Sequence, residues 1–220
     1  MSSDEGLYEK VLAAAGGELA APRPARGSAA VVLLRRLPED GIELFWLQRG
    51  EILPFMGGWH AFPGGGLERG DANLPVCGAP RDLRPDSWTR AAADEAGSPK
   101  ELDLVPGLLA CALRELFEET GVLVACTAIA HPAGSAPTPA PPGAPADRRR
   151  ADAPLVPVPE PAPAQLAEMR RAQLAGAKPL GAWLEGKGLA LDASGLQFAG
   201  RWLTPPFSPA RFDNRFFLLE

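Results

Sequence analysis

The chain of 220 residues contains few cysteines. The three that it has, Cys77, Cys111 and Cys126, are an odd number and show no CxxC spacing. Such a set is typical neither of a disulfide framework nor of a zinc site. We therefore expect a reducing compartment for this chain.

Positive charge is also scarce, because 22 Lys and Arg stand against 27 Asp and Glu, which gives a net charge of −5 at pH 7. This balance argues against a protein that binds nucleic acid through bulk charge. The acidic N-terminus carries no apolar segment of a signal peptide, and no run of 18 apolar residues is long enough to span a membrane. These absences predict a soluble cytoplasmic protein that binds neither nucleic acid nor membranes.

Apolar sequence is present in sufficient amount for a core, since 46% of the residues are hydrophobic. The length favours one decorated domain, which we place over residues 26–220 after an N-terminal extension over 1–25. The Val- and Leu-rich run that begins at Ser28 predicts a buried strand. The segment IELFWLQR follows a PEDG turn and predicts the partner strand of a hairpin.

Helices are predicted where apolar residues recur at three- and four-residue spacing. The clearest one begins at Pro106, and Gly121 lies where its C-terminal cap belongs. Eleven prolines between Pro132 and Pro163 predict a loop instead of regular structure. The other expected elements are helical stretches at 86–96, 99–104, 164–177 and 178–190, and strands at 122–130, from 200 and from 215 onward.

Three glutamates of the predicted helix lie on one stripe. Glu115, Glu118 and Glu119 are spaced at i, i+3 and i+4, which places their carboxylates close together. Like charges at this spacing repel one another unless water or a cation compensates them. Two interpretations are open on these residues alone: a solvated helix face, because Glu is a strong helix former, or a set of cation ligands.

The surrounding residues resemble the signature of the Nudix hydrolases. That signature is a glycine, five residues, an acidic residue, a spacer, and R-E-U-x-E-E-x-G-U, where U is apolar. Arg114 to Val122 match the second half in full, and Gly65 and Asp71 match the first half, with Asp in place of the usual Glu. The spacer of 72–113 is 42 residues long instead of seven, which implies an insert of 35 residues.

Within that family, the peroxisomal coenzyme A diphosphatases resemble this chain in carrying such an insert. They are also similar around FMGGWHAFPGG (55–65) and in a downstream W-x-T-P followed by RFD-x-RFF (202–217). Arg49 corresponds to the upstream arginine of a coenzyme A motif, and Gly58 falls at the spacing of that motif. Gly50 and Pro54 replace its serine and its second arginine, so this part of the resemblance is incomplete.

The resemblance implies an α/β fold, the Nudix α/β/α sandwich with a mixed sheet, a helical insert at 72–106 and a Pro-rich loop at 126–164. It also implies a metal-dependent diphosphatase. Clustered carboxylates suit hard divalent cations, so we expect Mg²⁺ or Mn²⁺ as the cofactor. The expected ligands are Glu115, Glu118, Glu119 and the backbone carbonyl of Gly64.

The remaining roles also follow from the resemblance. Either Glu115 or Glu118 is the general base that holds the attacking water, and the sequence does not separate the two. Arg114 is expected to orient one of the carboxylates. Gly65 and Gly66 are expected to let the loop approach the substrate, and Arg49 is a candidate for binding a substrate phosphate.

The favoured substrate is coenzyme A or an acyl-CoA. ADP-ribose, NADH and nucleotide sugars are alternatives, because related enzymes share the fold and the catalytic helix. A nucleotide-binding module without turnover is the alternative from another class, since Asp71, the insert and the early end of the chain depart from the pattern. The chain stops where a closing helix usually follows, so we expect a shortened chain or the front part of a longer polypeptide. A homodimer is one of the oligomeric states that the sequence leaves open.

Overall fold

The computed structural model describes six stretches of the chain, and for 101–106 it describes the backbone alone. The described residues are 24–52, 57–80, 101–127, 161–177, 179–205 and 211–220. The predicted helix at 86–96 and nearly all of the Pro-rich loop lie outside them. No helix of the described part is long and apolar enough to cross a membrane.

The larger sheet is mixed and is organised around β1 (Arg26–Arg36). β1 pairs in parallel with β10 (Phe212–Leu219) and antiparallel with both β2 (Ile42–Leu44) and β5 (Gly64–Gly66). β9 (Gln197–Leu203) extends the sheet beyond β10. Residues 28–32 of β1 are buried on both faces, as expected for a strand in the middle of a covered sheet. The mixed sheet and the buried first strand are therefore confirmed.

The predicted hairpin partner of β1 is confirmed only in its first half. Leu44 pairs with Leu34 and Ile42 with Arg36, across a 3-10 turn at Pro38–Asp40. The next residues leave this sheet, because β3 (Leu47–Gln48) pairs with β4 (His60–Ala61) in a separate two-stranded sheet.

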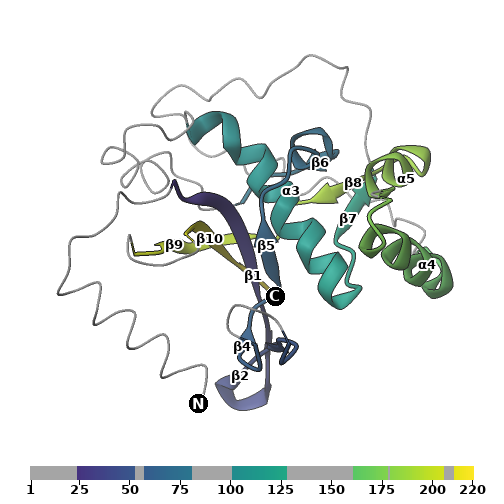
Figure 1. Cartoon of the computed structure of the whole chain (residues 1–220). Helices are drawn as coiled ribbons and strands as arrows, with labels where there is room; N and C mark the ends of the chain where they lie inside the picture. The colour runs from purple at the N-terminus through teal and green to yellow at the C-terminus, as the bar shows by residue number, and fades with distance from the viewer. Residues whose placement is uncertain (1–23, 53–56, 81–100, 128–160, 178, 206–210) are drawn as a thin grey trace, which may run out of the picture.

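The long helix α3 (Glu101–Thr120) lies across β1 and β5 (Figure 1). It ends as predicted at Gly121, whose φ of 82° favours glycine and whose N–H donates to the Phe117 carbonyl. The prediction of a separate helix at 99–104 is wrong, because one helix runs through Pro106. The proline removes one backbone hydrogen bond, at about 3 kcal/mol, and burial of the apolar residues that follow outweighs this loss at about 1.5–3 kcal/mol each.

A smaller sheet lies on the other side of α3. Its order is β6 (Val76–Cys77), β8 (Leu189–Asp192) and β7 (Ala125–Thr127), with β6 parallel and β7 antiparallel to β8. Residues from both sheets and from α3 join in one core. Its largest buried side chains include Phe117, Phe217, Leu108, Leu113, Leu116 and Leu191.

Two cysteines of the smaller sheet form one disulfide, whereas the number and spacing of the cysteines indicated no disulfide framework. Cys77 on β6 and Cys126 on β7 are 49 residues apart in sequence but flank the same strand, β8. Cys111 is free and buried in α3. The disulfide removes the argument for a reducing compartment, because disulfides persist mainly in oxidising ones. The cytoplasmic location stays a prediction.

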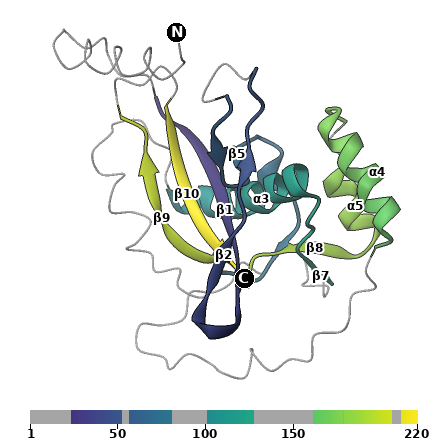
Figure 2. The same cartoon turned by 90° about the horizontal axis from the view of Figure 1, so that it is seen from below.

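The helices α4 (Pro163–Leu174) and α5 (Leu180–Gly186) confirm the two predicted after the Pro-rich loop. The second is shorter than predicted, because Gly188 with a φ of 64° interrupts it and β8 begins at the next residue. Figure 2 shows the order across the molecule, from β9 and β10 through β1 and α3 to α4 and α5. This arrangement places the glutamate-bearing turn of α3 against α4.

Candidate active site

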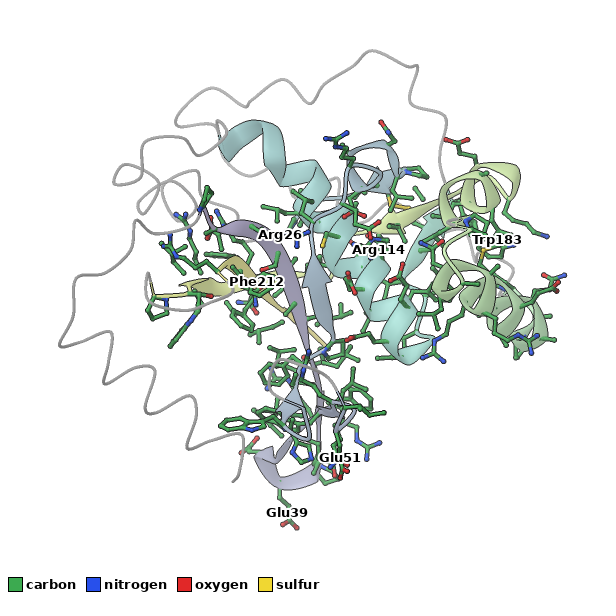
Figure 3. The ribbon with its side chains drawn as sticks, viewed as in Figure 1. Arg26, Glu39, Glu51, Arg114, Trp183 and Phe212 are labelled. Carbon is green, nitrogen blue, oxygen red and sulfur yellow. A yellow bond between two sulfur atoms is a disulfide. The ribbon has the colours of Figure 1, made fainter. Side chains whose placement is uncertain are left out.

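Arg114 of α3 lies at the centre of the candidate site (Figure 3). Its Nε donates to Asp71 Oδ1 at 2.6 Å, and its Nη2 donates to Asp71 Oδ2 at 3.1 Å. Both residues are buried, with 3% of Arg114 and 1% of Asp71 exposed. Asp71 begins the 3-10 turn η2 (Asp71–Asn73) and also accepts from the Glu68 N–H at 2.8 Å. This two-point pairing joins the two halves of the sequence motif, although 42 residues separate them in the chain.

The other edge of the Arg114 guanidinium meets two of the three glutamates. Nη1 donates to Glu115 Oε1 at 2.8 Å and to Glu118 Oε2 at 3.1 Å. Nη2 also donates to the Gly66 carbonyl at 3.1 Å. Arg114 therefore contacts two of the glutamates, where the sequence predicted that it orients one of them.

The glycines of β5 bring the loop into direct contact with the same glutamates. The Gly64 N–H donates to Glu119 Oε2 at 2.9 Å. A Cβ at Gly64 would lie 2.6 Å from Ala30 Cα, and a Cβ at Gly65 would lie 2.3 Å from Glu115 Oε1. The glycine loop expected here contains an extended strand, in which Gly64 and Gly65 leave no space for a Cβ against β1 and α3.

The electrostatics of the site are dominated by partly buried carboxylates. Burial raises the pKa of Glu115 to about 7 against the opposing charge of Arg114, and the charges of Glu118 and Glu119 add to the rise. Burial likewise raises the pKa of Glu119, although the Gly64 N–H and the charge of Arg49 act in the opposite direction. Added positive charge would therefore stabilise both ionised carboxylates.

Arg49, the predicted phosphate-binding residue, lies near this group. Its backbone N–H donates to the Trp59 carbonyl at 2.8 Å, which ties the end of β3 to the segment before β4. Its charge acts on Glu119, as the pKa of that carboxyl reflects. Its Nε is buried and has no hydrogen-bond partner among the described residues. A guanidinium with an unused donor beside Glu119 suits an anionic substrate group.

Two residues of α4 belong to the site, and the sequence analysis did not identify either of them. Gln173 Nε2 donates to Glu118 Oε1 at 2.9 Å. Arg170 donates to the backbone carbonyls of Glu118 and Glu119, at 2.7 and 2.8 Å. No local motif marks these residues, which lie more than 50 positions after the glutamates.

The donor set fits a hard divalent cation in its chemistry. Glu115, Glu118 and Glu119 supply carboxylate oxygens, and the absence of a Cβ at Gly65 lets the Glu115 carboxylate pack directly against β5. Among the described residues, no three acidic, Cys or His side chains converge as a preformed metal site. Each glutamate is instead held by its own donor, from Arg114, Gln173 or Gly64.

The chain as a whole is similar to a solved Nudix hydrolase. The crystal structure of that enzyme from Alicyclobacillus acidocaldarius superposes with a TM-score of 0.57 and 28% sequence identity, over 89% of this chain and 69% of that chain. No family model matches the chain, and no curated protein matches it. The similarity in three dimensions thus agrees with the motif that Arg114 holds together.

Proposed function

We propose that this chain, an enzyme of the Nudix class with the fold of a Nudix hydrolase, cleaves the diphosphate linkage of a nucleoside diphosphate derivative. The observation that carries this proposal is the contact of Arg114 with Asp71, Glu115, Glu118 and the Gly66 carbonyl. It gathers the acidic helix turn and the glycine strand at one place. Cleavage of a phosphoric anhydride depends mainly on positioning and charge neutralisation, which such a cluster can provide with a cation.

The cation is Mg²⁺ or Mn²⁺ in this proposal, held by Glu115, Glu118, Glu119 and the Gly64 carbonyl. Once bound, it neutralises charge on the diphosphate oxygens. Arg114 keeps two of these carboxylates in place. Asp71 in turn holds Arg114 with two hydrogen bonds in a buried position.

Glu115 is the better candidate for the general base. Glu118 already accepts hydrogen bonds at both oxygens, from Arg114 and Gln173, whereas the described residues engage Glu115 at Oε1 alone. In this proposal Glu115 accepts the proton of the attacking water at Oε2, the oxygen that Arg114 does not contact. The water oxygen then bonds to one phosphorus, while the bridging oxygen leaves on the other phosphate.

Coenzyme A or an acyl-CoA is the proposed substrate, and ADP-ribose, NADH and nucleotide sugars are the alternatives. Support comes from the resemblance of residues 55–65 to the coenzyme A diphosphatases and from Arg49, whose Nε has no partner in the described part of the chain. Trp59, which is 43% exposed, is available to stack on a base.

The test is a substrate panel with Mg²⁺, resolved by chromatography of the products. We expect coenzyme A to yield an adenosine bisphosphate and a phosphopantetheine. Intact coenzyme A together with consumed ADP-ribose would move the assignment to that substrate. A nucleotide that raises the unfolding temperature without yielding any product would favour the binding module.

A further inference from the structure

Helix α4 contacts α3 at the turn that carries Glu118 and Glu119. Arg170 and Gln173 are three residues apart on α4 and therefore share one face of it. Arg170 binds the two backbone carbonyls of that turn, and Gln173 binds the Glu118 carboxylate. α4 thus holds both the backbone and one functional side chain of the turn.

The amide of Gln173 is fixed in one orientation by a second contact. Its Oε1 accepts from the backbone N–H of Leu180, the first residue of α5, at 3.2 Å. Gln173 is only 6% exposed, so water does not offer an easy substitute for either partner. Because the amide oxygen is occupied by a donor, its NH₂ group faces Glu118, and Glu118 is bound as an acceptor.

We propose that Gln173 is a positioning residue that prepares Glu118 to bind a divalent cation. The Gln173 amide holds Oε1 and the Arg114 guanidinium holds Oε2, so the carboxylate is restricted to one orientation before the cation arrives. Each oxygen keeps a second lone pair for coordination. Ordering the side chain in advance removes an entropic cost from cation binding.

This inference rests on the proposed function in one respect, since it takes Glu118 as a cation ligand. It goes beyond that proposal by extending the site to α4 and to the start of α5. A purely structural role predicts something different: Gln173 would only join two helices, and its loss would lower stability without changing the intrinsic affinity for the cation.

The experiment measures Mn²⁺ binding to the full chain by electron paramagnetic resonance, without substrate. Gln173→Met keeps the side-chain length and removes the amide. We expect its dissociation constant for Mn²⁺ to rise about tenfold, the change that corresponds to one charge-assisted hydrogen bond. Gln165→Met, on an exposed position of the same helix, is the matched control and should bind Mn²⁺ as the wild type does.

A double-mutant cycle separates positioning from structure. If Gln173 acts through Glu118, then Gln173→Met should weaken Mn²⁺ binding no further in a Glu118→Gln background. An equal loss in both backgrounds, or an unchanged Mn²⁺ affinity with a lower unfolding temperature, would overturn the inference. Should Gln173→Met fail to fold, Gln173→Asn keeps an amide but is one methylene short, and unchanged Mn²⁺ affinity in that variant would also overturn it.

The same data distinguish this inference from the proposed function. If Glu118→Gln binds Mn²⁺ like the wild type, the metal site itself is misassigned, and both proposals fail. If Glu118→Gln loses Mn²⁺ but Gln173→Met binds it normally, only the positioning role fails.

Discussion

Two arginine–carboxylate clusters lie at different places in the described part of the chain. In the first, on α3, Arg114 contacts Glu115 among several carboxylates. In the second, on β9 and β10, Asp213 accepts from Arg201 at 2.6 and 2.8 Å and also pairs with Arg215. Figure 2 shows these strands on the opposite side of the molecule from α4 and α5.

The carboxylates of the two clusters are shifted in opposite directions. Burial raises the pKa of Glu115 to about 7. The charge of Arg114 lowers this pKa, whereas the charges of the neighbouring glutamates raise it further. Burial would also raise the pKa of Asp213, but Arg201 and Arg215 outweigh it and the pKa is lowered. On β9 and β10 the two arginines stabilise the ionised carboxylate of Asp213. On α3 Arg114 does not fully compensate the buried glutamates, so further positive charge would stabilise them. Carboxylates with a raised pKa are typical of functional sites.

The largest expected effect is on stability, when Arg114 is replaced. Arg114→Met leaves Asp71 buried without its partner, and removing one partner of a buried pair costs about 3–5 kcal/mol. Chemical denaturation should show a loss of this size. Arg171→Met, at an exposed position of α4, is the control and should change the unfolding free energy by no more than about 0.5 kcal/mol. Equal losses in the two variants would contradict a central role for Arg114.

The next effect is mainly on activity. Glu118→Gln should lower Mg²⁺-dependent product release about 100-fold, because it removes a charged ligand from the site. Its unfolding free energy should fall by no more than about 1–3 kcal/mol, because Gln has a single acceptor oxygen and can accept from Arg114 or from Gln173 but not from both. The matched control is Glu168→Gln on the exposed side of α4. An unchanged rate in Glu118→Gln would remove the acidic turn from the mechanism.

The cluster of Arg201, Asp213 and Arg215 on β9 and β10 should instead affect stability and leave activity unchanged. Asp213→Asn should lower the unfolding free energy by about 2 kcal/mol, because it removes the charge that two arginines bind, while kcat per folded molecule is retained. Glu43→Gln breaks the exposed pair with Arg35 and is the control, with an expected loss under about 1 kcal/mol. Lost activity in a folded Asp213→Asn protein would show that the two clusters do not differ as described.

The smallest effect is a difference in pH dependence, measured on the protein in a chelator. Because the pKa of Glu115 is raised from 4.5 to about 7, its contribution to stability is present below pH 4.5 and is lost as the pH rises through 7. Asp213 has the opposite sign, since its contribution is lost as the pH falls below 3.8. Glu115→Gln should lack the decrease between pH 4.5 and 7. Parallel denaturation profiles for this variant and the wild type would contradict the raised pKa.

The sequence predicted those elements that depend on local patterns. The buried strand from Ser28 and the end of α3 at Gly121 depend on local apolar patterns and caps, and both are found in the structure. β5 was not predicted, because glycine has a low strand propensity, and at Gly64 and Gly65 the neighbouring β1 and α3 leave no room for a Cβ. This steric restriction arises only in the folded chain, so the sequence alone does not predict it.

Contacts between segments that are distant in sequence could not be predicted either. Cys77 and Cys126 meet because both strands flank β8, whose first two residues were predicted to end a helix. Gln173 reaches Glu118 only through the packing of α4 on α3. The motif therefore predicts candidate residues for the chemistry, whereas the contacts of Gln173 and Arg170 with the acidic turn follow only from the packing of the folded chain.

The most direct test is a crystal structure of the protein grown with Mn²⁺, with the ion located by its anomalous scattering. The account predicts a peak coordinated by carboxylate oxygens of Glu115, Glu118 and Glu119 beside Gly64. A peak bound elsewhere, with these three glutamates still held by Arg114, Gln173 and Gly64 alone, would contradict it.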